Sequence, residues 1–293
     1  MPKTLFVVAG QDGLRLVSEN GIDWKNKQMG KEGETYRAAC VGNGVCIAVG
    51  SYGGGNILSV LTDEKTWKTT PHDAKYVKYL RGLGYGKSFF LGLGGDPGSV
   101  GSSKPFIMTT EKGEKWDGPT DIPGKHILRR VAFGNGTFAA VGDRGRRAAS
   151  RDGKEWTDAT ETKAIDTLID IAFGNGVFVG VGLHGLRMTS KDGLAWTDRQ
   201  LGEEGEHLNS IVWAKDRFVA VGTGATYISS NGVKWERKPN DNAPQAVAFG
   251  NGVFVGAAWK GRLLISEDGA KWRETLKAER HVEVVAWGEI AGA

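Results

Sequence analysis

Cysteine is scarce in this chain of 293 residues, which contains only Cys40 and Cys46, and two further features are missing. No apolar stretch is long enough to span a bilayer, so membrane insertion is not expected. Lysine and arginine are spread along the chain without the runs that mark nucleic-acid-binding tails, and the net charge is only +4. These absences predict a globular protein that neither inserts into membranes nor binds nucleic acid.

Signals for processing and for cofactors are missing too. Residues 1–8 contain no signal-peptide h-region, so we expect a cytoplasmic location for the chain as written. A secreted or periplasmic location is expected if a leader was removed. No glycine-rich loop is followed by a helix, as nucleotide binding would need, and the histidines lack compact metal-ligand spacing. We therefore expect no cofactor and no metal.

Glycine, by contrast, is abundant, with 45 residues, where an average usage of about 7% would give roughly 20. Many of these glycines belong to a repeat. Segments 131–138, 171–178 and 247–254 each read as a strand, a Gly-Asn-Gly turn and a second strand. Asn-Gly favours a type I′ turn because both central residues need positive φ, so each segment predicts a β-hairpin.

A second repeated element, Ser-x-Asp/Asn-Gly-x-x-Trp, follows downstream and predicts another hairpin. Its tryptophans recur about every 40 residues, the period of one four-stranded propeller blade. In two copies the turn residues are altered, but the tryptophan is kept. The seven tryptophans are Trp24, Trp67, Trp116, Trp156, Trp196, Trp235 and Trp272.

The two elements together predict an all-β fold, a seven-bladed β-propeller of four-stranded antiparallel blades in one domain, residues 1–293. We name the strands of a blade A to D from the centre outwards. Residues 6–10 already match strand B, and residues 285–288 match strand A, so the C-terminal strand should pair with the N-terminal strands. In that pairing Trp287 should be buried. The expected blades are 282–293 plus 1–27, 36–70, 79–119, 128–159, 168–199, 208–238 and 245–275.

The same alignment predicts on which face of the sheet each of the two cysteines lies. In the predicted hairpin Val41 pairs with Cys46 and Cys40 with Ile47, so the thiols alternate to opposite faces of the sheet. A disulfide needs converging Cβ vectors. We therefore expect two buried free thiols.

The Ser-x-Asp-Gly-x-x-Trp element, as in residues 150–156, resembles the Asp box, or bacterial neuraminidase repeat, in a form shortened by one residue. The resemblance covers nearly the whole chain and implies a sialidase-like propeller fold. Seven such blades are also similar to photosystem II assembly-factor propellers, which bind protein partners. No Arg-Ile-Pro-type motif of the sialidases is present, so the resemblance carries over no catalytic residue.

Candidate site residues concentrate on the face that carries the B–C and D–A connections, called here the loop-rich face. Its B–C loops at 51–56 and 95–105 are enlarged. Aligned residues two positions before the core of strand A should lie near the mouth of the central channel, where three arginines could form a fork for a carboxylate or phosphate or make structural ion pairs. Arg15, Arg147 and Arg187, near the start of strand C, are interpreted as structural. The ligand-binding candidates are Arg37, Arg81, Arg129, Tyr52, His184, His207, Asn209, Gln245, Trp259, His281 and Glu283.

Two functions compete at this stage. The first is a monomeric binding or scaffold propeller that recognises a glycan or an acidic partner protein on the loop-rich face. The second is a carbohydrate-active enzyme, a glycoside hydrolase or polysaccharide lyase, acting on an acidic sugar. The catalytic residues of such an enzyme cannot be named from spacing, so whether the chain is an enzyme stays open.

Overall fold

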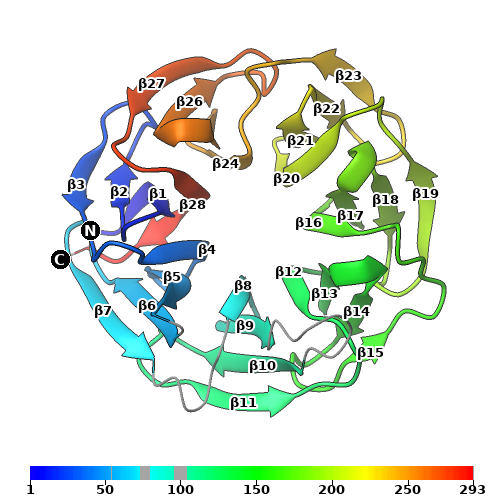
Figure 1. Cartoon of the computed structure of the whole chain (residues 1–293), viewed down its shortest axis with the longest axis horizontal. Helices are drawn as coiled ribbons and strands as arrows, with labels where there is room; N and C mark the ends of the chain where they lie inside the picture. The colour runs from blue at the N-terminus through cyan, green and yellow to red at the C-terminus, as the bar shows by residue number, and fades with distance from the viewer. Residues whose placement is uncertain (54, 73–79, 96–103, 293) are drawn as a thin grey trace.

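The chain forms a ring of seven four-stranded antiparallel sheets around a central channel, so the predicted fold is confirmed (Figure 1). The structure is a computed structural model that describes residues 1–292 except 54, 73–79 and 96–103. The sheets of the first four blades are β28 (Val282–Ile290), β1 (Lys3–Gly10), β2 (Arg15–Ser18) and β3 (Lys25–Gln28); β4 (Thr35–Gly42), β5 (Val45–Tyr52), β6 (Gly55–Leu61) and β7 (Trp67–His72); β8 (Leu80–Gly86), β9 (Phe89–Gly95), β10 (Pro105–Thr110) and β11 (Asp117–Asp121); and β12 (Leu128–Gly134), β13 (Thr137–Gly142), β14 (Arg147–Ser150) and β15 (Thr157–Asp158).

The remaining blades follow the same plan, and three B–C turns contain a short 3₁₀ segment. None of the described helices has the length and apolar character that crossing a membrane would require. The sheets are β16 (Leu168–Gly174), β17 (Val177–Gly182), β18 (Arg187–Ser190) and β19 (Trp196–Gln200); β20 (His207–Ala214), β21 (Arg217–Thr223), β22 (Ala225–Ser229) and β23 (Glu236–Pro239); and β24 (Ala246–Gly250), β25 (Val253–Ala258), β26 (Arg262–Ser266) and β27 (Arg273–Lys277), with η1 (Asp143–Gly145), η2 (Leu183–Gly185) and η3 (Trp259–Gly261).

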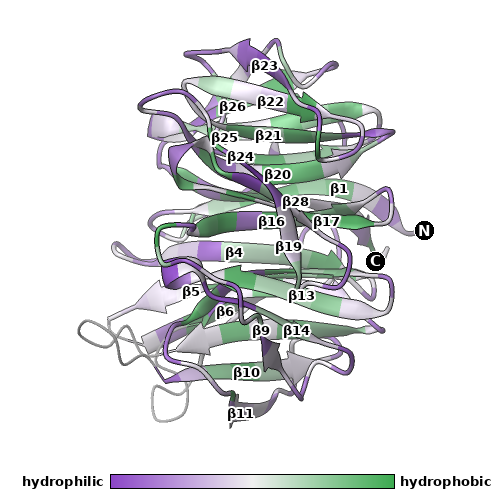
Figure 2. Cartoon of the chain, turned by 90° about the vertical axis from the view of Figure 1, so that its right-hand side faces the viewer, coloured by the Kyte–Doolittle hydropathy of each residue, from purple (hydrophilic) through white to green (hydrophobic). Residues whose placement is uncertain are grey.

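The ring closes as predicted, because β28 from the C-terminal end pairs antiparallel with β1. Leu5 lies opposite Gly288 and Val8 opposite Val285 in this ladder. The prediction that Trp287 is buried is wrong: its ring is half-buried and packs 6.5 Å from that of Phe6. The two chain ends lie close together on one side of the disc (Figures 1 and 2).

The core lies between neighbouring blades as well as inside them. In Figure 2 apolar segments run along the strands within the disc, and hydrophilic segments gather in the connections. An aromatic residue of strand A packs on the glycine that ends strand A of the preceding blade. A Cβ on Gly174 would lie 2.1 Å from the ring of Trp213. This contact explains the first glycine of the repeated Gly-Asn-Gly turn, which therefore serves packing as well as the turn.

The cysteine register is confirmed: Val41 pairs with Cys46 and Cys40 with Ile47, and both thiols are free. Cys46 is fully buried, whereas Cys40 is only half-buried overall. Burial of the thiol raises the pKa of Cys40 to about 12 and raises that of Cys46 as well. Both sulfurs are therefore protonated and unreactive in the folded chain.

The expected enlargement of the B–C loop at 51–56 is wrong. Ser51 pairs with Asn56 and Tyr52 with Gly55, so these residues prolong the β5–β6 hairpin. The strands themselves are longer here, because the ladder continues past the point where other blades turn. Most of the second enlarged loop, residues 96–103 of 95–105, lies outside the described residues.

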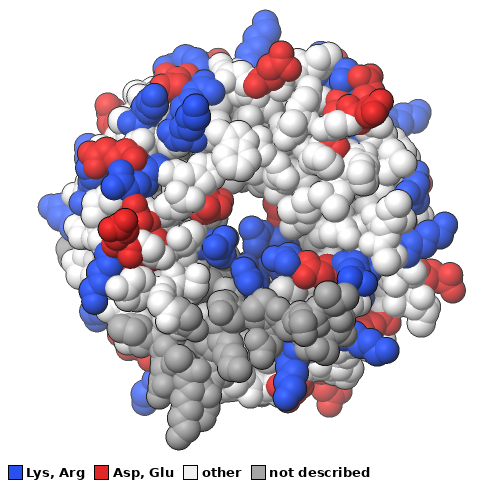
Figure 3. Space-filling model, viewed as in Figure 1, with Lys and Arg blue, Asp and Glu red and all other residues white. Residues whose placement is uncertain are grey.

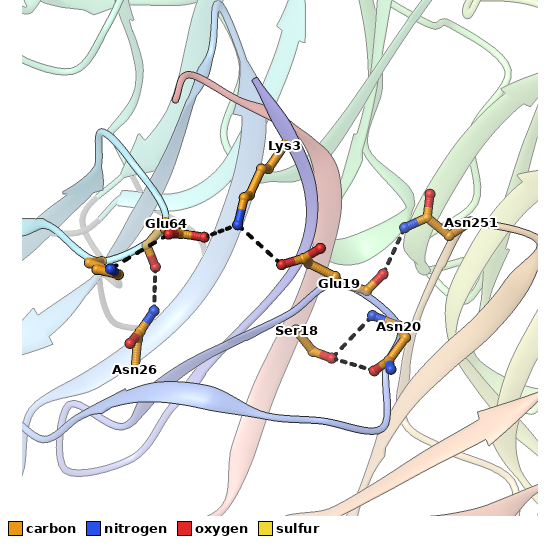
Figure 4. A network of polar contacts seen from close by, with 8 residues as sticks. Lys3, Ser18, Glu19, Asn20, Asn26, Glu64 and Asn251 are labelled. Carbon is orange, nitrogen blue, oxygen red and sulfur yellow. Dashed lines mark hydrogen bonds and ion pairs between the residues drawn. The ribbon is translucent and has the colours of Figure 1, made fainter. Parts of the chain in front are cut away.

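The opposite face, with the A–B and C–D turns, holds the blades together and is called here the turn face. Figure 4 shows Lys3 Nζ 2.5 Å from Glu64 Oε2 of the second blade and 3.4 Å from Glu19 Oε1 of the first. Asn251 of the seventh blade donates its side-chain amide to the Glu19 carbonyl at 2.7 Å. Exposed ion pairs of this kind contribute little stability individually, and here they connect three blades where the ring closes.

Candidate functional site

The seven aligned positions at the start of strand A share an unusual backbone geometry. In six blades the register between strands A and B shifts at this residue, which is the sign of a β-bulge. A bulge leaves one residue unpaired and re-aims its side chain. In the seventh blade the equivalent residue directly precedes β24, and its N–H donates to Ala257 at 2.7 Å. The positions are Arg37, Arg81, Arg129, Ile169, Asn209, Gln245 and Glu283.

Glycines at the end of strand B make room for these bulges. A Cβ on Gly142 would lie 2.1 Å from the Ile127 carbonyl, and one on Gly222 would lie 1.9 Å from the His207 carbonyl. Any larger residue would push the start of strand A away. The recurrence of glycine at this position is a sequence signal for the bulges. The analysis of the hairpin turns did not use this signal.

The three arginines lie on one side of the channel mouth. Figure 3 shows basic side chains gathered along one side of the central opening, where β4, β8 and β12 begin, with mostly uncharged surface opposite. The strands of Arg81 and Arg129 touch, since a Cβ on Gly82 would lie 2.1 Å from the Arg129 carbonyl. Arg37 is exposed, whereas Arg81 and Arg129 are half-buried. The structure thus brings together the three cations that the alignment placed in adjacent blades.

A fourth arginine, which sequence reasoning did not single out, lies deeper in the channel. Arg130 Nη1 donates to the carbonyls of Arg81 and Arg129, both at 3.1 Å. Its Nε lies 3.9 Å from Asp170 Oδ1, which is a loose ion pair. Arg130 therefore holds β8 and β12 together beneath the exposed arginines and adds positive charge to the same side.

The other bulge residues are arranged differently. Asn209 donates its side-chain amide to the Gln245 carbonyl oxygen, so these two residues satisfy each other. Glu283 is half-buried, and its side chain forms no hydrogen bond or ion pair among the described residues. It lies on β28, which packs against β4, so it is a neighbour of Arg37 and lies three blades away from Arg129 (Figure 1).

Below the mouth, a channel pocket of about 170 Å³ is lined by Arg130, Asp170, Asn209, Gln245 and Glu283 among others. Asp170 accepts hydrogen bonds from the N–H of Ile171 and from the N–H of Ile211 in the next blade, both at 2.9 Å. Its side chain is 16% exposed, and burial raises its pKa despite the nearby Arg130. Asp170 thus links two inner strands that have no backbone ladder between them.

The aromatic and histidine candidates lie in separate pairs around the rim. The His184 N–H donates to His207 Nδ1 at 3.1 Å, which joins a B–C turn to the start of β20. Trp259, in η3, is 64% exposed and stacks on His281 with ring centroids 5.1 Å apart and planes 9° apart. Tyr52 is exposed at the end of β5, where Lys31 Nζ lies 5.6 Å from its ring centre.

These pairs do not converge with the arginines on a single catalytic centre. Within the described part of the chain, no group of three or more histidine, cysteine, aspartate or glutamate side chains could hold a metal ion. The geometry offers a positively charged mouth, a polar channel below it and aromatic surfaces at the rim. Such an arrangement can bind a ligand by charge and stacking.

The arginines of strand C are structural, as interpreted from the sequence, but their partners are not carboxylates. Arg15 is buried and donates to the hydroxyls of Ser59 and Thr69, both at 2.7 Å. Arg187 lies 4.0 Å from the centre of the Tyr227 ring and donates to the Gly185 carbonyl at 2.7 Å. Arg147, also buried, donates to the Asp166 carbonyl at 3.1 Å. None of the three is available to a ligand.

Comparison with known proteins finds solved structures of the same architecture. No protein family model matches the sequence, and no curated protein matches it either. A structure of YCF48 bound to D1 peptide has a TM-score of 0.61 and 14% identity, covering 90% of this chain and 85% of that chain. YCF48 from Cyanidioschyzon merolae has a TM-score of 0.57 and 15% identity, covering 82% and 85%. The WD40 β-propeller domain of Doa1 has a TM-score of 0.63 and 12% identity, covering 86% of each chain.

Identities this low establish the propeller fold alone. The neighbours are propellers of the WD40 and YCF48 kinds. They assign no ligand, and residues must be judged from the geometry of this chain.

Proposed function

We propose that residues 1–293 act as one binding domain, which recognises an acidic segment of a partner protein at the channel mouth of the loop-rich face. The observation that carries the proposal is the row of bulge arginines, Arg37, Arg81 and Arg129, on three adjacent inner strands. Guanidinium groups bind carboxylates through paired hydrogen bonds. A run of acidic side chains laid across β4, β8 and β12 would meet all three in turn.

Apolar side chains on the same face support a protein partner. The cores of protein interfaces are enriched in aromatic residues, methionine and arginine. Five of the large hydrophobic residues that are exposed lie on the loop-rich face, four in its connections and Tyr52 at the end of β5. They are Met29, Tyr52, Ile165, Leu201 and Trp259. The D1 peptide in a YCF48 structure supports the view that a propeller of similar fold can hold a peptide.

A second candidate is an acidic glycan, and the stacked Trp259 favours it. The exposed face of an indole suits stacking on a sugar ring, while an arginine would hold the carboxylate of the sugar. In this proposal the Ser-x-Asp-Gly-x-x-Trp elements are contracted Asp boxes of a sialidase-like propeller. The chain would then be a carbohydrate-binding protein, or a glycoside hydrolase or polysaccharide lyase. Product analysis with uronic-acid and sialic-acid oligosaccharides tests for the enzyme, and binding of the same oligosaccharides tests for the carbohydrate-binding protein.

The test is binding of a fluorescein-labelled octaglutamate peptide, followed by fluorescence anisotropy. Wild type should bind it, and binding should weaken as salt rises, because salt screens exposed charges. Replacing Arg37, Arg81 and Arg129 together with alanine should weaken binding by about tenfold or more. Circular dichroism melting checks that the variant is folded, and a glutamine triple variant, which retains polarity, serves if the alanine variant unfolds.

The matched control removes the same charge from the turn face. Lys154, Lys234 and Lys271 are exposed in the C–D turns of the fourth, sixth and seventh blades. Their triple replacement by alanine should leave octaglutamate binding nearly unchanged. Equal losses in the two triple variants would mean that only net charge matters, and no binding by wild type would contradict the proposed protein-binding function.

A further inference from the structure

The Arg129 guanidinium already holds a carboxylate. Its Nε and Nη2 both donate to Asp143, the second of these bonds at 2.9 Å, in a fork-to-fork pair. Asp143 is the first residue of η1, so it reaches Arg129 from the B–C turn of the same blade. A carboxylate in this position shows how the site accommodates a carboxyl group, because it uses the two-point geometry that an incoming ligand would use.

Three other blades have no acid at this position of the B–C turn. The corresponding first residue of the B–C turn is Gln11 in the first blade, Leu183 in the fifth and Trp259 in the seventh. The turn itself therefore does not require an acid. Arg37, at the matching bulge position two blades away, is exposed and forms no ion pair among the described residues.

We propose that Asp143 is an internal ligand, which occupies the carboxylate subsite of Arg129 and is exchanged for a carboxylate of the bound partner. This inference rests on the proposed function, because it assigns a subsite and a competitor to the same mouth. The Arg129 side chain is 42% exposed and that of Asp143 is 34% exposed, so both groups are accessible to an incoming carboxylate. Exposed pairs are weak, so an external carboxylate can replace the internal one.

Exchange also limits the repulsion within the row of arginines. Without a ligand, Asp143 compensates one of the cations, and Arg130 adds a further positive charge just below. When a ligand supplies its own carboxylate, the charge balance at Arg129 is unchanged and Asp143 turns to solvent. The site therefore selects ligands that bring at least one carboxylate for Arg129 in addition to those for its neighbours.

The test is Asp143→Asn with the octaglutamate probe. Removing the competitor should tighten binding by about three- to fivefold, the range expected when a weak exposed ion pair no longer has to be broken. The control is Asp216→Asn on the turn face, where Asp216 pairs with Arg217 at 2.9 Å and both side chains are exposed. It removes the same charge from a comparable pair and should change binding by less than twofold.

The outcomes separate this inference from the proposed function. Tighter binding by Asp143→Asn alone supports exchange. Equal changes in the two variants overturn it, and so does weaker binding by Asp143→Asn, which would make Asp143 a positioning residue for Arg129. If octaglutamate binds neither wild type nor the variant, the proposed function fails. The exchange of carboxylates at Arg129 is then tested independently, by titrating each protein with acetate and following the Nε–Hε NMR signal of Arg129. That signal should shift at lower acetate concentration in Asp143→Asn, and identical titrations would overturn the inference.

Discussion

At the scale of single residues, the channel separates side chains that stabilise the ring from side chains that can meet a ligand. Arg130 and Asp170 point into the channel, yet both are engaged with the backbone of a neighbouring blade. Arg37 and Glu283 have no such partner among the described residues. Sequence alignment alone could not make this distinction, because adjacent positions of one strand differ in role according to which side of a bulge they occupy.

Asp170 provides a test at this scale. Replacing it with alanine leaves the N–H groups of Ile171 and Ile211 without their acceptor. Each buried orphan donor costs about 1–3 kcal/mol, so the loss of both acceptors should lower the free energy of unfolding by roughly 2–6 kcal/mol in urea titration. The control Asp216→Ala concerns an acid whose side chain is 73% exposed and should change stability little. Equal stability of Asp170→Ala and wild type would mean that water replaces the carboxylate at no cost.

At the scale of the elements, the C–D turn behaves as a self-contained unit. Asp152 Oδ1 accepts from the N–H groups of Lys154 and Glu155 at 2.8 and 2.9 Å, and the Gly153 N–H donates to Ser150 Oγ at 2.8 Å. The bonds from the Glu155 and Lys154 backbone lower the pKa of Asp152. Asn20 makes the same backbone contacts in the first blade with an amide oxygen, which does not titrate.

This difference predicts a pH dependence. For Asp192 and Asp268 burial acts in the opposite direction, but the hydrogen bonds within the turn outweigh it, so their pKa is lowered like that of Asp152. An acid with a lowered folded pKa stabilises the fold above its unfolded pKa of about 3.9, and this stabilisation is lost as pH falls through the folded value. Acidification should therefore lower the Tm of the variant in which all three residues are replaced by asparagine less than it lowers the Tm of wild type.

Thermal melting at neutral pH and at about pH 3 measures this difference. At neutral pH the triple variant should melt close to wild type, since asparagine already serves in the turns of Asn20 and Asn231. The control is Asp241→Asn, an exposed acid whose side chain accepts no hydrogen bond among the described residues. An equal acid-induced fall in Tm for wild type and the triple variant would show that these turns do not set the acid sensitivity.

The elements were also where sequence reasoning was most successful. Turn residues and strand alternation are local, so Asn-Gly and Asp-Gly signals located the hairpins, and the register of Cys40 and Cys46 followed. The pairing of Arg129 with Asp143 was beyond reach, because it depends on a bulge and on the length of one B–C turn. The burial of Trp287 was overestimated, since a match to strand A does not show which residues cover the strand from the neighbouring blade.

At the scale of the whole molecule, closure by β28 predicts that the stability of the entire ring depends on this strand. Deleting residues 281–293 removes the buried side chains of Val282, Val285 and Ile290 and exposes the edge of β1. At roughly 1.5–3 kcal/mol for each fully buried side chain of this size, the loss of stability should exceed about 5 kcal/mol. Urea unfolding of the truncated chain measures it.

The matched truncation deletes residues 291–293 only. It retains β28 and loses the hydrogen bond from the Ala291 N–H to the Gly44 carbonyl, at 2.7 Å. This shorter deletion should unfold almost like the full chain. If both truncated chains were as stable as the full one, the β1–β28 ladder would not hold the ring closed.

The origin of the first blade from both ends of the chain also affects biosynthesis. Among the strands of the ring, β1 leaves the ribosome first and its partner β28 leaves it last. At about 5–20 residues per second, the edge of β1, with its apolar Phe6, Val7 and Val8, waits tens of seconds for that partner. During this time the nascent chain presents an unpaired apolar strand of the kind that recruits other chains. Production of the protein should therefore depend on chaperones that cover this segment during translation, even though the completed ring leaves no blade open.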